Sequence, residues 1–217
     1  PRRVSGALRF DAMDEPAAPI VGLVLAAGAG TRFGGPKGLA RDAAGTPWVE
    51  RAVDTLRRGG CGRVLVAVGA RGDEVAALVP PGAEVVTAAA WADGLSATLR
   101  AGLAAAVPPG PVRPAAVVPP GPVRPAAVVI LPVDVPDAPP SAVRRVVAAA
   151  DADLSTALVQ ATYDGAPGHP VLIGAEHAPA LAESVAGDDG ARLYLRTHGV
   201  IRVECGDLWS GADIDTR

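Results

Sequence analysis

Short, continuously apolar runs alternate with helical patterns along most of this chain, and this alternation constrains the fold more than any other feature. Runs rich in Val, Ile and Leu are typical of strands that are buried on both faces of a sheet. Helices between such strands favour parallel pairing, because a parallel connection needs a long crossover. The pattern therefore predicts an α/β protein with a three-layer, Rossmann-like fold, in which a mostly parallel sheet carries helices on both faces.

The limits of the expected elements follow from these runs and from the residues between them. The first helix, for example, has Thr46 as its N-cap, Pro47 in the first helical position and Gly59 as its stop. The expected strands are Ile20–Ala26, Arg63–Val68, Ala83–Thr87, Ala126–Val133, Thr156–Tyr163, Val171–Ile173 and Val200–Glu204. The expected helices are Pro47–Arg58, Asp73–Val79, Ser96–Ala106, Ser141–Ala150, Pro179–Val185 and Ala191–His198.

Composition limits the classes of function. Hydrophobic residues make up 49% of the chain and the net charge is −3 without a basic block, so nucleic acid is not an expected partner. The apolar run at 20–29 is too short to span a bilayer, so no membrane partner is expected either. Two distant cysteines, Cys61 and Cys205, imply neither a disulfide framework nor a zinc site, and they suit a reducing cytoplasm.

A single domain is expected over residues 20–217, after a leader at 1–19 that we expect to be disordered. The segment PPGPVRPAAVV occurs at 108–118 and is repeated letter for letter at 119–129. Two units bury no core between them, so the repeat is a tandem duplication and not a solenoid. The second copy runs into an expected strand, which leaves the first as an inserted proline-rich surface loop. The alternative is a docking site for a proline-reading partner.

The stretch LVLAAGAGTRFGGPK, residues 23–37, ends an apolar strand in glycines, one arginine and one lysine. Gly28 and Gly30 permit backbone angles that turn N–H groups toward an anion, and Arg32 and Lys37 supply charge for phosphate oxygens. The stretch lacks the Gly-Lys-Ser/Thr ending of a P-loop and the G-x-G-x-x-G pattern of a dinucleotide site. It is either a phosphate-binding loop or a glycine-rich turn whose cations are solvated.

Two further motifs place polar residues at the ends of elements. Asp134 ends the strand in VVILPVDVPDAP, where a carboxylate beside a phosphate site can hold Mg²⁺ or, alternatively, close the strand as an Asx turn. In WADGLSATLRAGL, Gly94 and Ser96 begin a helix. The exposed start of that helix could contact a ribose or a base, although most of the motif is explained by a buried helix face.

Several polar residues late in the chain have similarly open interpretations. His169 enters a short strand, and Asp188 and Arg192 stand at a helix start, where acids complement the helix dipole. Asp213 and Asp215 are two residues apart, so they share one face if the segment is extended. The sequence shows no Ser-His-Asp arrangement and no Cys/His cluster, so neither nucleophilic nor zinc chemistry is expected.

Together these motifs resemble those of the molybdenum cofactor nucleotidyltransferases, specifically the cytidylyltransferase branch. LAAGAGTRFGGPK is similar to the family pattern L-A-A-G-x-S-x-R-M-G-x-x-K, and GLSATLRAGL is similar to G-[ML]-S-x-S-L-R-x-G-L. LPVDVP, GHPVLI, GDDGARLYL and DIDT follow in the family order, so the resemblance covers residues 20–217. It implies a Rossmann-like nucleotidyltransferase fold.

The resemblance also implies an activity and roles for individual residues. The implied reaction transfers a nucleoside monophosphate from an NTP to a phosphate monoester and releases pyrophosphate. The implied catalytic residues are Lys37 at the reacting phosphate, Arg32 on the triphosphate, and Asp134, which would hold Mg²⁺ together with Asp215. The implied nucleotide contacts are Leu25, Ala26, Ala27, Gly28, Gly30, Arg32, Lys37, Gly94 and Ser96. The implied substrate contacts are His169, Asp188 and Arg192.

The expected substrates are CTP and molybdopterin or its molybdenum-loaded form, with a molybdenum hydroxylase as a further partner. Ala27 favours CTP, because the cytidylyl branch typically reads L-A-A-G where the guanylyl branch reads L-A-G-G. One alternative is a nucleotidyltransferase that uses GTP or acts on a sugar or alcohol phosphate. Another is a non-catalytic carrier of the molybdenum cofactor, which the unusual segment GLARDAAG after Lys37 keeps open.

Overall fold

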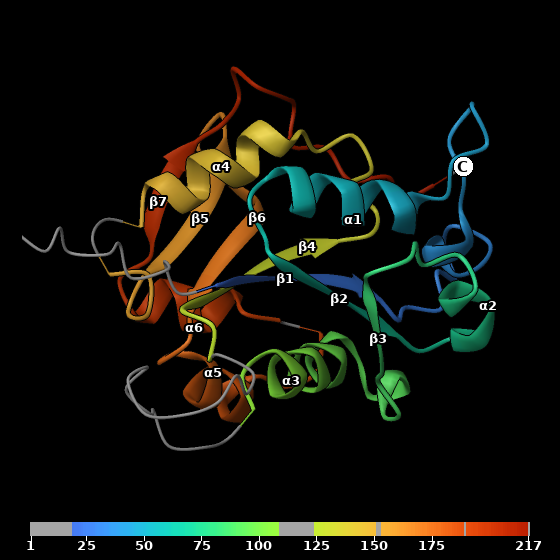
Figure 1. The fold of residues 1–217 in the computed structure, drawn as a ribbon, viewed down its shortest axis with the longest axis horizontal. Coiled ribbons are helices and arrows are strands. Elements are labelled where there is room, and N and C mark those ends of the chain that lie inside the picture. Colours follow the sequence, from blue (N-terminus) through green and yellow to red (C-terminus); the bar gives the residue numbers. More distant parts are fainter. Residues whose placement is uncertain (1–18, 109–123, 151–152, 189, 217) are drawn as a thin grey trace, which may run out of the picture.

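The computed structural model describes residues 19–108, 124–150, 153–188 and 190–216 (Figure 1). Within these ranges the chain forms a seven-stranded sheet with the strand order β3-β2-β1-β4-β6-β5-β7. Every described strand runs in one direction except β6, which is antiparallel to its neighbours β4 and β5. The fold class expected from the sequence, an α/β fold with a mostly parallel sheet, is confirmed.

The elements lie close to the expected ranges. The strands are β1 (Ile20–Ala26), β2 (Arg63–Val68), β3 (Glu84–Thr87), β4 (Ala127–Pro132), β5 (Leu158–Tyr163), β6 (Ala166–Gly174) and β7 (Ile201–Glu204). The α-helices are α1 (Trp48–Arg58), α2 (Gly72–Ala76), α3 (Leu95–Ala106), α4 (Pro140–Ala148), α5 (Ala178–Ser184) and α6 (Arg192–Thr197). Short 3-10 helices lie at η1 (Lys37–Leu39) and η2 (Trp91–Asp93).

Most limits differ from the expected ones by a few residues, and the start of β6 differs most. Helix α1 begins at Trp48 with Pro47 as its N-cap, one position later than expected. Strand β6 begins at Ala166 and not at Val171, because a tight turn returns the chain onto β5 and pairs Tyr163 with Ala166. Both turn residues, Asp164 and the glycine after it, have positive φ angles of 50° and 80°. The longer β6 therefore delivers extra residues to the carboxyl edge of its neighbour β4.

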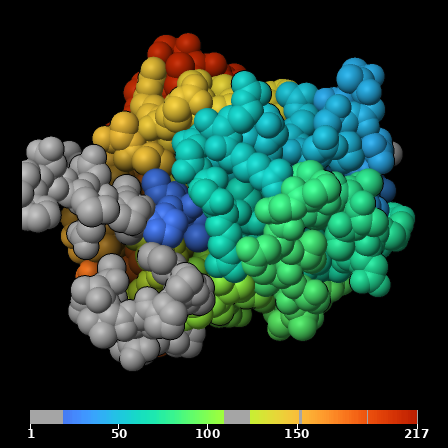
Figure 2. Space-filling model, in the orientation of Figure 1, coloured from blue at the N-terminus to red at the C-terminus, as the bar shows by residue number. Residues whose placement is uncertain are grey.

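Helices cover both faces of the sheet (Figure 1). Helices α1 and α4 pack on one face, in a core that includes Leu56 and Val143. Helices α3, α5 and α6 pack on the other face, in a core that includes Leu103. Strand β1 serves both cores, since Val24 faces the first and Leu23 the second. In the space-filling view the side chains of α1 and β3 form a continuous surface on the face shown (Figure 2).

Strand β1 lies at the point where the chain changes its direction of travel across the sheet, with β2 on one side and β4 on the other. The register aligns Leu25 with Pro132, so β1 and β4 end at the same level and their loops open side by side. Ligands of open α/β sheets bind in the crevice at such a switch point. A ligand site is therefore expected at the loops that follow β1 and β4.

The expected leader and the duplicated segment lie largely outside the described residues. Pro19 is described, and its carbonyl oxygen accepts a hydrogen bond from the N–H of Ala126 at 3.1 Å. Of the repeat, residue 108 and residues 124–129 are described, and the second copy leads directly into β4. Within the described ranges, no helix is long and apolar enough to cross a membrane.

Gly59 allows the end of α1 to pack closely against α4. A β-carbon at this position would lie 2.4 Å from Cγ1 of Val143 and 2.9 Å from the carbonyl oxygen of Thr55. We expect Gly59→Ala to lower the free energy of unfolding by about 1–3 kcal/mol through overpacking. The matched control is Gly62→Ala in the same turn, where nothing lies within 4 Å of the added carbon. Chemical denaturation measures both variants, and equal losses would contradict a packing role for Gly59.

Candidate functional site

The loop between β1 and η1 is closed by hydrogen bonds to a single carbonyl group. The N–H groups of Phe33 and Gly35 each donate to the carbonyl oxygen of Gly30 at 3.0 Å. Gly30 has a φ of 59°, and a β-carbon there would lie 1.9 Å from the carbonyl oxygen of Gly35, so only glycine fits. The ring of Phe33 anchors the loop against Trp48, with 5.3 Å between the ring centroids. The loop is therefore preformed.

Lys37 follows this loop and turns its side chain toward the end of β4. Its Nζ lies 3.0 Å from Oδ2 of Asp134 and 2.7 Å from Oδ1 of Asp215. Burial alone would lower the pKa of Lys37, but the hydrogen bonds to the two carboxylates outweigh it and raise the pKa. The hydrogen bond from Lys37 also lowers the pKa of Asp215, and the charge of Arg32 adds to this. Lys37 and Asp215 are thus both charged at neutral pH.

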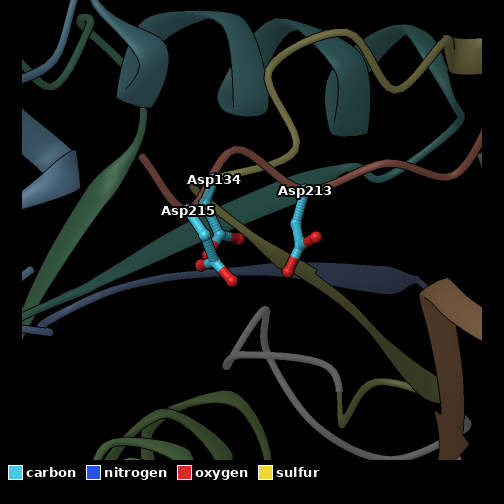
Figure 3. Close-up of side chains that lie close together, drawn as sticks. All are labelled: Asp134, Asp213 and Asp215. Atoms are coloured by element: carbon cyan, nitrogen blue, oxygen red, sulfur yellow. The ribbon is translucent and has the colours of Figure 1, made fainter. Parts of the chain in front are cut away.

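Three carboxylates gather at this edge of the sheet (Figure 3). Asp134 follows β4, whereas Asp213 and Asp215 belong to the C-terminal segment, and one oxygen from each lies within 4.8 Å of the others. The N–H of Ile214 donates to the carbonyl oxygen of Asp134 at 2.9 Å, and its side chain packs on the core, so the flanking acids share the opposite face. Asp213 is an addition to the two acids expected from the resemblance, and its spacing from Asp215 was the sequence signal for it.

Tyr163, at the end of β5, holds the C-terminal segment beside the start of β6. Its hydroxyl donates to the carbonyl oxygen of His169 at 2.6 Å, and burial raises its pKa, so it remains a donor. Its ring packs edge-on against Trp209, with 5.3 Å between the centroids. Gly211 lies so close that a β-carbon there would be 2.3 Å from the ring. Sequence patterns gave no sign of this role, because all of these contacts are between separate segments.

Arg51, on α1, ties together the loops that follow η1 and β4. Its Nε donates to the carbonyl oxygen of Pro136 at 3.0 Å, and its terminal nitrogens bond Asp42 at 2.7 Å and Asp137 at 3.0 Å. The segment GLARDAAG, which departs from the family pattern, is therefore folded back after Lys37 and fixed to the neighbouring loop. This contact holds the two charged loops of the site in register.

A cavity of about 830 Å³ opens between these loops, a volume within the range of small-molecule sites. The residues expected from the sequence that line it are Leu25, Ala26, Ala27, Gly28, Gly30, Lys37, Gly94, Asp134, His169, Asp188 and Arg192. Further lining residues that the sequence reasoning missed include Trp91, Leu95, Thr98, Pro167 and Asp213. The structure thus brings most of the expected site residues around one cavity.

Two of the expected nucleotide contacts, Arg32 and Ser96, are not in the cavity lining. The side chain of Arg32 is exposed and lies close enough to Asp215 to lower the pKa of that acid. Ser96 is 0% exposed, and both its hydroxyl and its N–H donate to the carbonyl oxygen of Gly187. The next residue, Asp188, accepts from the N–H of Leu95 at 3.3 Å. Ser96 therefore holds this turn against α3, and its side chain does not reach the cavity.

His169, on β6, and Arg192, at the start of α6, both line the cavity. Burial lowers the pKa of His169 to about 4, although the carboxylates of Asp134 and Asp213 act in the opposite direction. The imidazole is thus neutral at pH 7, where it can form hydrogen bonds but carries no charge. Arg192, which begins α6 and is exposed, adds a positive charge to the cavity lining.

Comparison with known proteins relates this site to a family. The sequence matches the MobA-like NTP transferase domain over residues 22–203. It is also 34% identical over 207 residues to nicotine blue oxidoreductase from Paenarthrobacter nicotinovorans, and the alignment covers 91% of this chain and 92% of that protein. The two findings carry different names for the reaction.

Solved structures with a similar fold include Rv0371c from Mycobacterium tuberculosis H37Rv, with a TM-score of 0.74 and 26% identity over 93% of this chain and 95% of that one. A structure of Rv0371c in complex with manganese has a TM-score of 0.63 and 24% identity, with coverage of 86% and 88%. A nucleotidyl transferase from Methanothermobacter thermautotroptrophicus has a TM-score of 0.71 and 22% identity, with coverage of 91% and 92%. Because the domain match spans most of the chain, the resemblance seen in the motifs is confirmed, and the chain belongs to the MobA-like NTP transferase domain family.

Proposed function

We propose that the chain is a nucleotidyltransferase that moves CMP from CTP to a phosphate monoester acceptor, molybdopterin or its molybdenum-loaded form, and releases pyrophosphate. The main support for this proposal is that Lys37 contacts a cluster of carboxylates. This cluster lies beside the Gly30 turn, at the switch point between β1 and β4. Nucleotidyl transfer requires positioned charge and not a covalent enzyme group. This site supplies such charge at a place where α/β sheets bind ligands.

The chemistry needs little from the protein beyond position and charge. A phosphate monoester is already anionic, so no side chain has to remove a proton from it. Its oxygen forms a bond to the α-phosphorus while the bond to the β-phosphate oxygen breaks, and pyrophosphate leaves in line. Lys37 is only 15% exposed, so its charge is poorly screened by water and interacts strongly with the charge that develops on the phosphates. The backbone N–H groups of the Gly28–Gly30 turn would bind the triphosphate.

The acid cluster suits a hard divalent cation. Mg²⁺ prefers carboxylate and phosphate oxygens, and Asp134, Asp213 and Asp215 offer three such oxygens within 4.8 Å of one another. We assign Mg²⁺ to these three residues. When bound, it would neutralise charge on the triphosphate and polarise the α-phosphate.

The acceptor and the cellular setting complete the proposal. The cationic Arg192 and the neutral His169 in the cavity lining suit a phosphate-bearing acceptor with further hydrogen-bonding groups. Ala27 supports CTP over GTP. Cys61 and Cys205 are both buried free thiols, which fits a cytoplasmic enzyme that passes its product to a molybdenum hydroxylase.

Asp134→Asn should abolish turnover without loss of the fold. The amide keeps the shape of the side chain but removes the charge that holds Mg²⁺, so we expect kcat to fall by more than about 100-fold. The loss of activity is measured as pyrophosphate release in an assay that contains CTP, Mg²⁺ and molybdopterin, and thermal unfolding checks the fold. The control is Asp54→Asn, an exposed acid on α1 that pairs with Arg58 at 3.2 Å. A fully active Asp134→Asn enzyme would remove Asp134 from the metal site.

Lys37→Ala should lower kcat by about 100- to 1,000-fold and leave KM for CTP within about threefold, because Lys37 acts on charge that develops during transfer. Lys37 is the only lysine in the chain, so it can also be labelled selectively. At alkaline pH, where part of the Nζ is neutral, pyridoxal phosphate followed by borohydride should modify Lys37, and CTP should protect it from modification. Peptide mapping separates this label from that on the N-terminal amine. An unchanged kcat, or labelling that CTP does not slow, would place Lys37 away from the reacting phosphates.

The identity to nicotine blue oxidoreductase favours a second candidate, an oxidoreductase that uses the same cavity. A loop that binds the triphosphate of an NTP could equally bind the pyrophosphate of a nicotinamide dinucleotide, and the open cavity could accept a planar dye. This candidate assigns no task to the three carboxylates, which is why we place it second.

One pair of assays separates the two candidates. We expect CTP with molybdopterin and Mg²⁺ to release pyrophosphate, and GTP, ATP and UTP to release less. We expect NADH or NADPH with nicotine blue to give no bleaching above the uncatalysed rate. Bleaching that is unaffected by Asp134→Asn, with no pyrophosphate release, would overturn nucleotidyl transfer in favour of the oxidoreductase. Binding of molybdopterin alone, with neither reaction, would favour the carrier.

A further inference from the structure

Trp91 differs from the other aromatic side chains in the described part of the chain, because no second ring packs against it. The others form the pairs Phe33–Trp48, Tyr163–Trp209 and Tyr194–His198. Trp91 is partly exposed and lines the cavity beside the loop that follows β1. Trp91 thus borders the cavity and belongs to neither of the two cores.

The position of Trp91 is fixed by the backbone beneath it. Its N–H donates to the carbonyl oxygen of Ala88 at 3.0 Å, and the N–H of Ala88 donates to the carbonyl oxygen of Val68 at 2.8 Å, which ties the turn to β2. A β-carbon on Gly69 would lie 2.5 Å from Cβ of Trp91 and 2.8 Å from Cβ of Ala27. Trp91 therefore rests on the backbone of Gly69, next to the methyl group of Ala27.

The cavity extends from the switch point in two directions with different chemistry. On the β2 side its lining includes Trp91, whose turn is tied to β2. On the β6 side it includes His169, because β6 is antiparallel to β4 and presents its first residues at this edge. The lining residue Arg192 begins α6, after a turn that is hydrogen-bonded to the start of α3. A phosphate-bearing acceptor matches the cation Arg192. A flat, uncharged ring matches the side with the indole, since aromatic side chains stack on the faces of bases.

We infer that Trp91 is the platform on which the nucleobase of the NTP stacks, and that Ala27 acts on base selection through the position of Trp91. This inference rests on the proposed nucleotidyl transfer and names its base site. Ala27 is only 2% exposed, so a ligand has almost no access to its methyl group. The methyl group lies beside the indole, so a change from alanine to glycine would leave the indole free to shift.

The first test compares binding of CTP with binding of inorganic tripolyphosphate, which has no base. Trp91→Ala should weaken CTP binding by about 5- to 100-fold and leave tripolyphosphate binding unchanged. Trp91→Phe should recover most of the CTP affinity because it keeps an aromatic face. Leu193→Ala is the control, since Leu193 is 54% exposed and outside the cavity lining. Titration calorimetry with Mg²⁺ present measures each affinity, and thermal unfolding confirms that each variant is folded.

The outcomes separate this inference from the proposed function. A wild-type protein that binds no CTP would contradict the proposed function itself. Wild-type CTP binding that Trp91→Ala leaves unchanged would overturn the platform, and so would an equal loss of tripolyphosphate binding. A raised acceptor KM with unchanged CTP affinity would place the acceptor on the indole and would also overturn it. If the alanine variant unfolds, Trp91→Leu keeps the apolar bulk and serves in its place.

The second test is a double-mutant cycle on the ratio of CTP to GTP affinities. Ala27→Gly should lower the preference for CTP in the wild-type background. In the Trp91→Ala background the same substitution should change the ratio by less than about twofold, because the side chain through which it acts is gone. An equal effect in both backgrounds, or no effect in the wild type, would overturn the role given to Ala27.

Discussion

The ammonium group of Lys37 sits among carboxylates that would repel one another without it, and the arrangement of the site depends on this balance of charge. Its two acid partners come from the end of β4 and from the C-terminal segment, so one side chain joins three distant parts of the chain. The pairing is tight because the lysine is largely buried, where attraction between opposite charges is less screened than at the surface. A divalent cation would satisfy the same carboxylates, so Lys37 and a metal can share the acids between them.

The fold brings these groups together through two kinds of constraint. Parallel pairing of β1 with β4 ends both strands at one level, which fixes where the two loops begin. Side chains outside the charged cluster then fix where the loops go: Arg51 joins the loops after η1 and β4, and Tyr163 holds the start of β6 beside the C-terminal segment. The proposed transfer forms no covalent enzyme intermediate, so it depends on precise placement of the charged groups. The contacts of Arg51 and Tyr163 provide that placement.

Local signals predicted much of this molecule, and long-range contacts account for what they missed. The limits of β1 and β2 were predicted fully, because each is a continuous apolar run with a clear start and stop. The antiparallel direction of β6 was not predicted, since it depends on pairing with β4 and not on its own residues. Ser96 was predicted as a nucleotide contact at a helix start. Its hydroxyl instead donates to the carbonyl oxygen of Gly187, which lies far along the chain. Trp91 was given no role and Asp213 was noted only for its spacing from Asp215, because only the folded chain shows that they border the cavity.

Membership of the family leaves the reaction open, because one fold can host different chemistries and a relative at 34% identity is named an oxidoreductase. The carboxylate cluster is the feature that distinguishes the two candidates physically. The single charge of Lys37 balances only part of the charge on the three acids, so beside the proposed phosphate-binding loop the cluster still hinders a dinucleotide that binds without a cation. It favours an NTP that binds with a divalent cation, since the acids then hold the cation against the phosphates. Hydride transfer gains nothing from such a cluster, whereas nucleotidyl transfer uses every charged group in it.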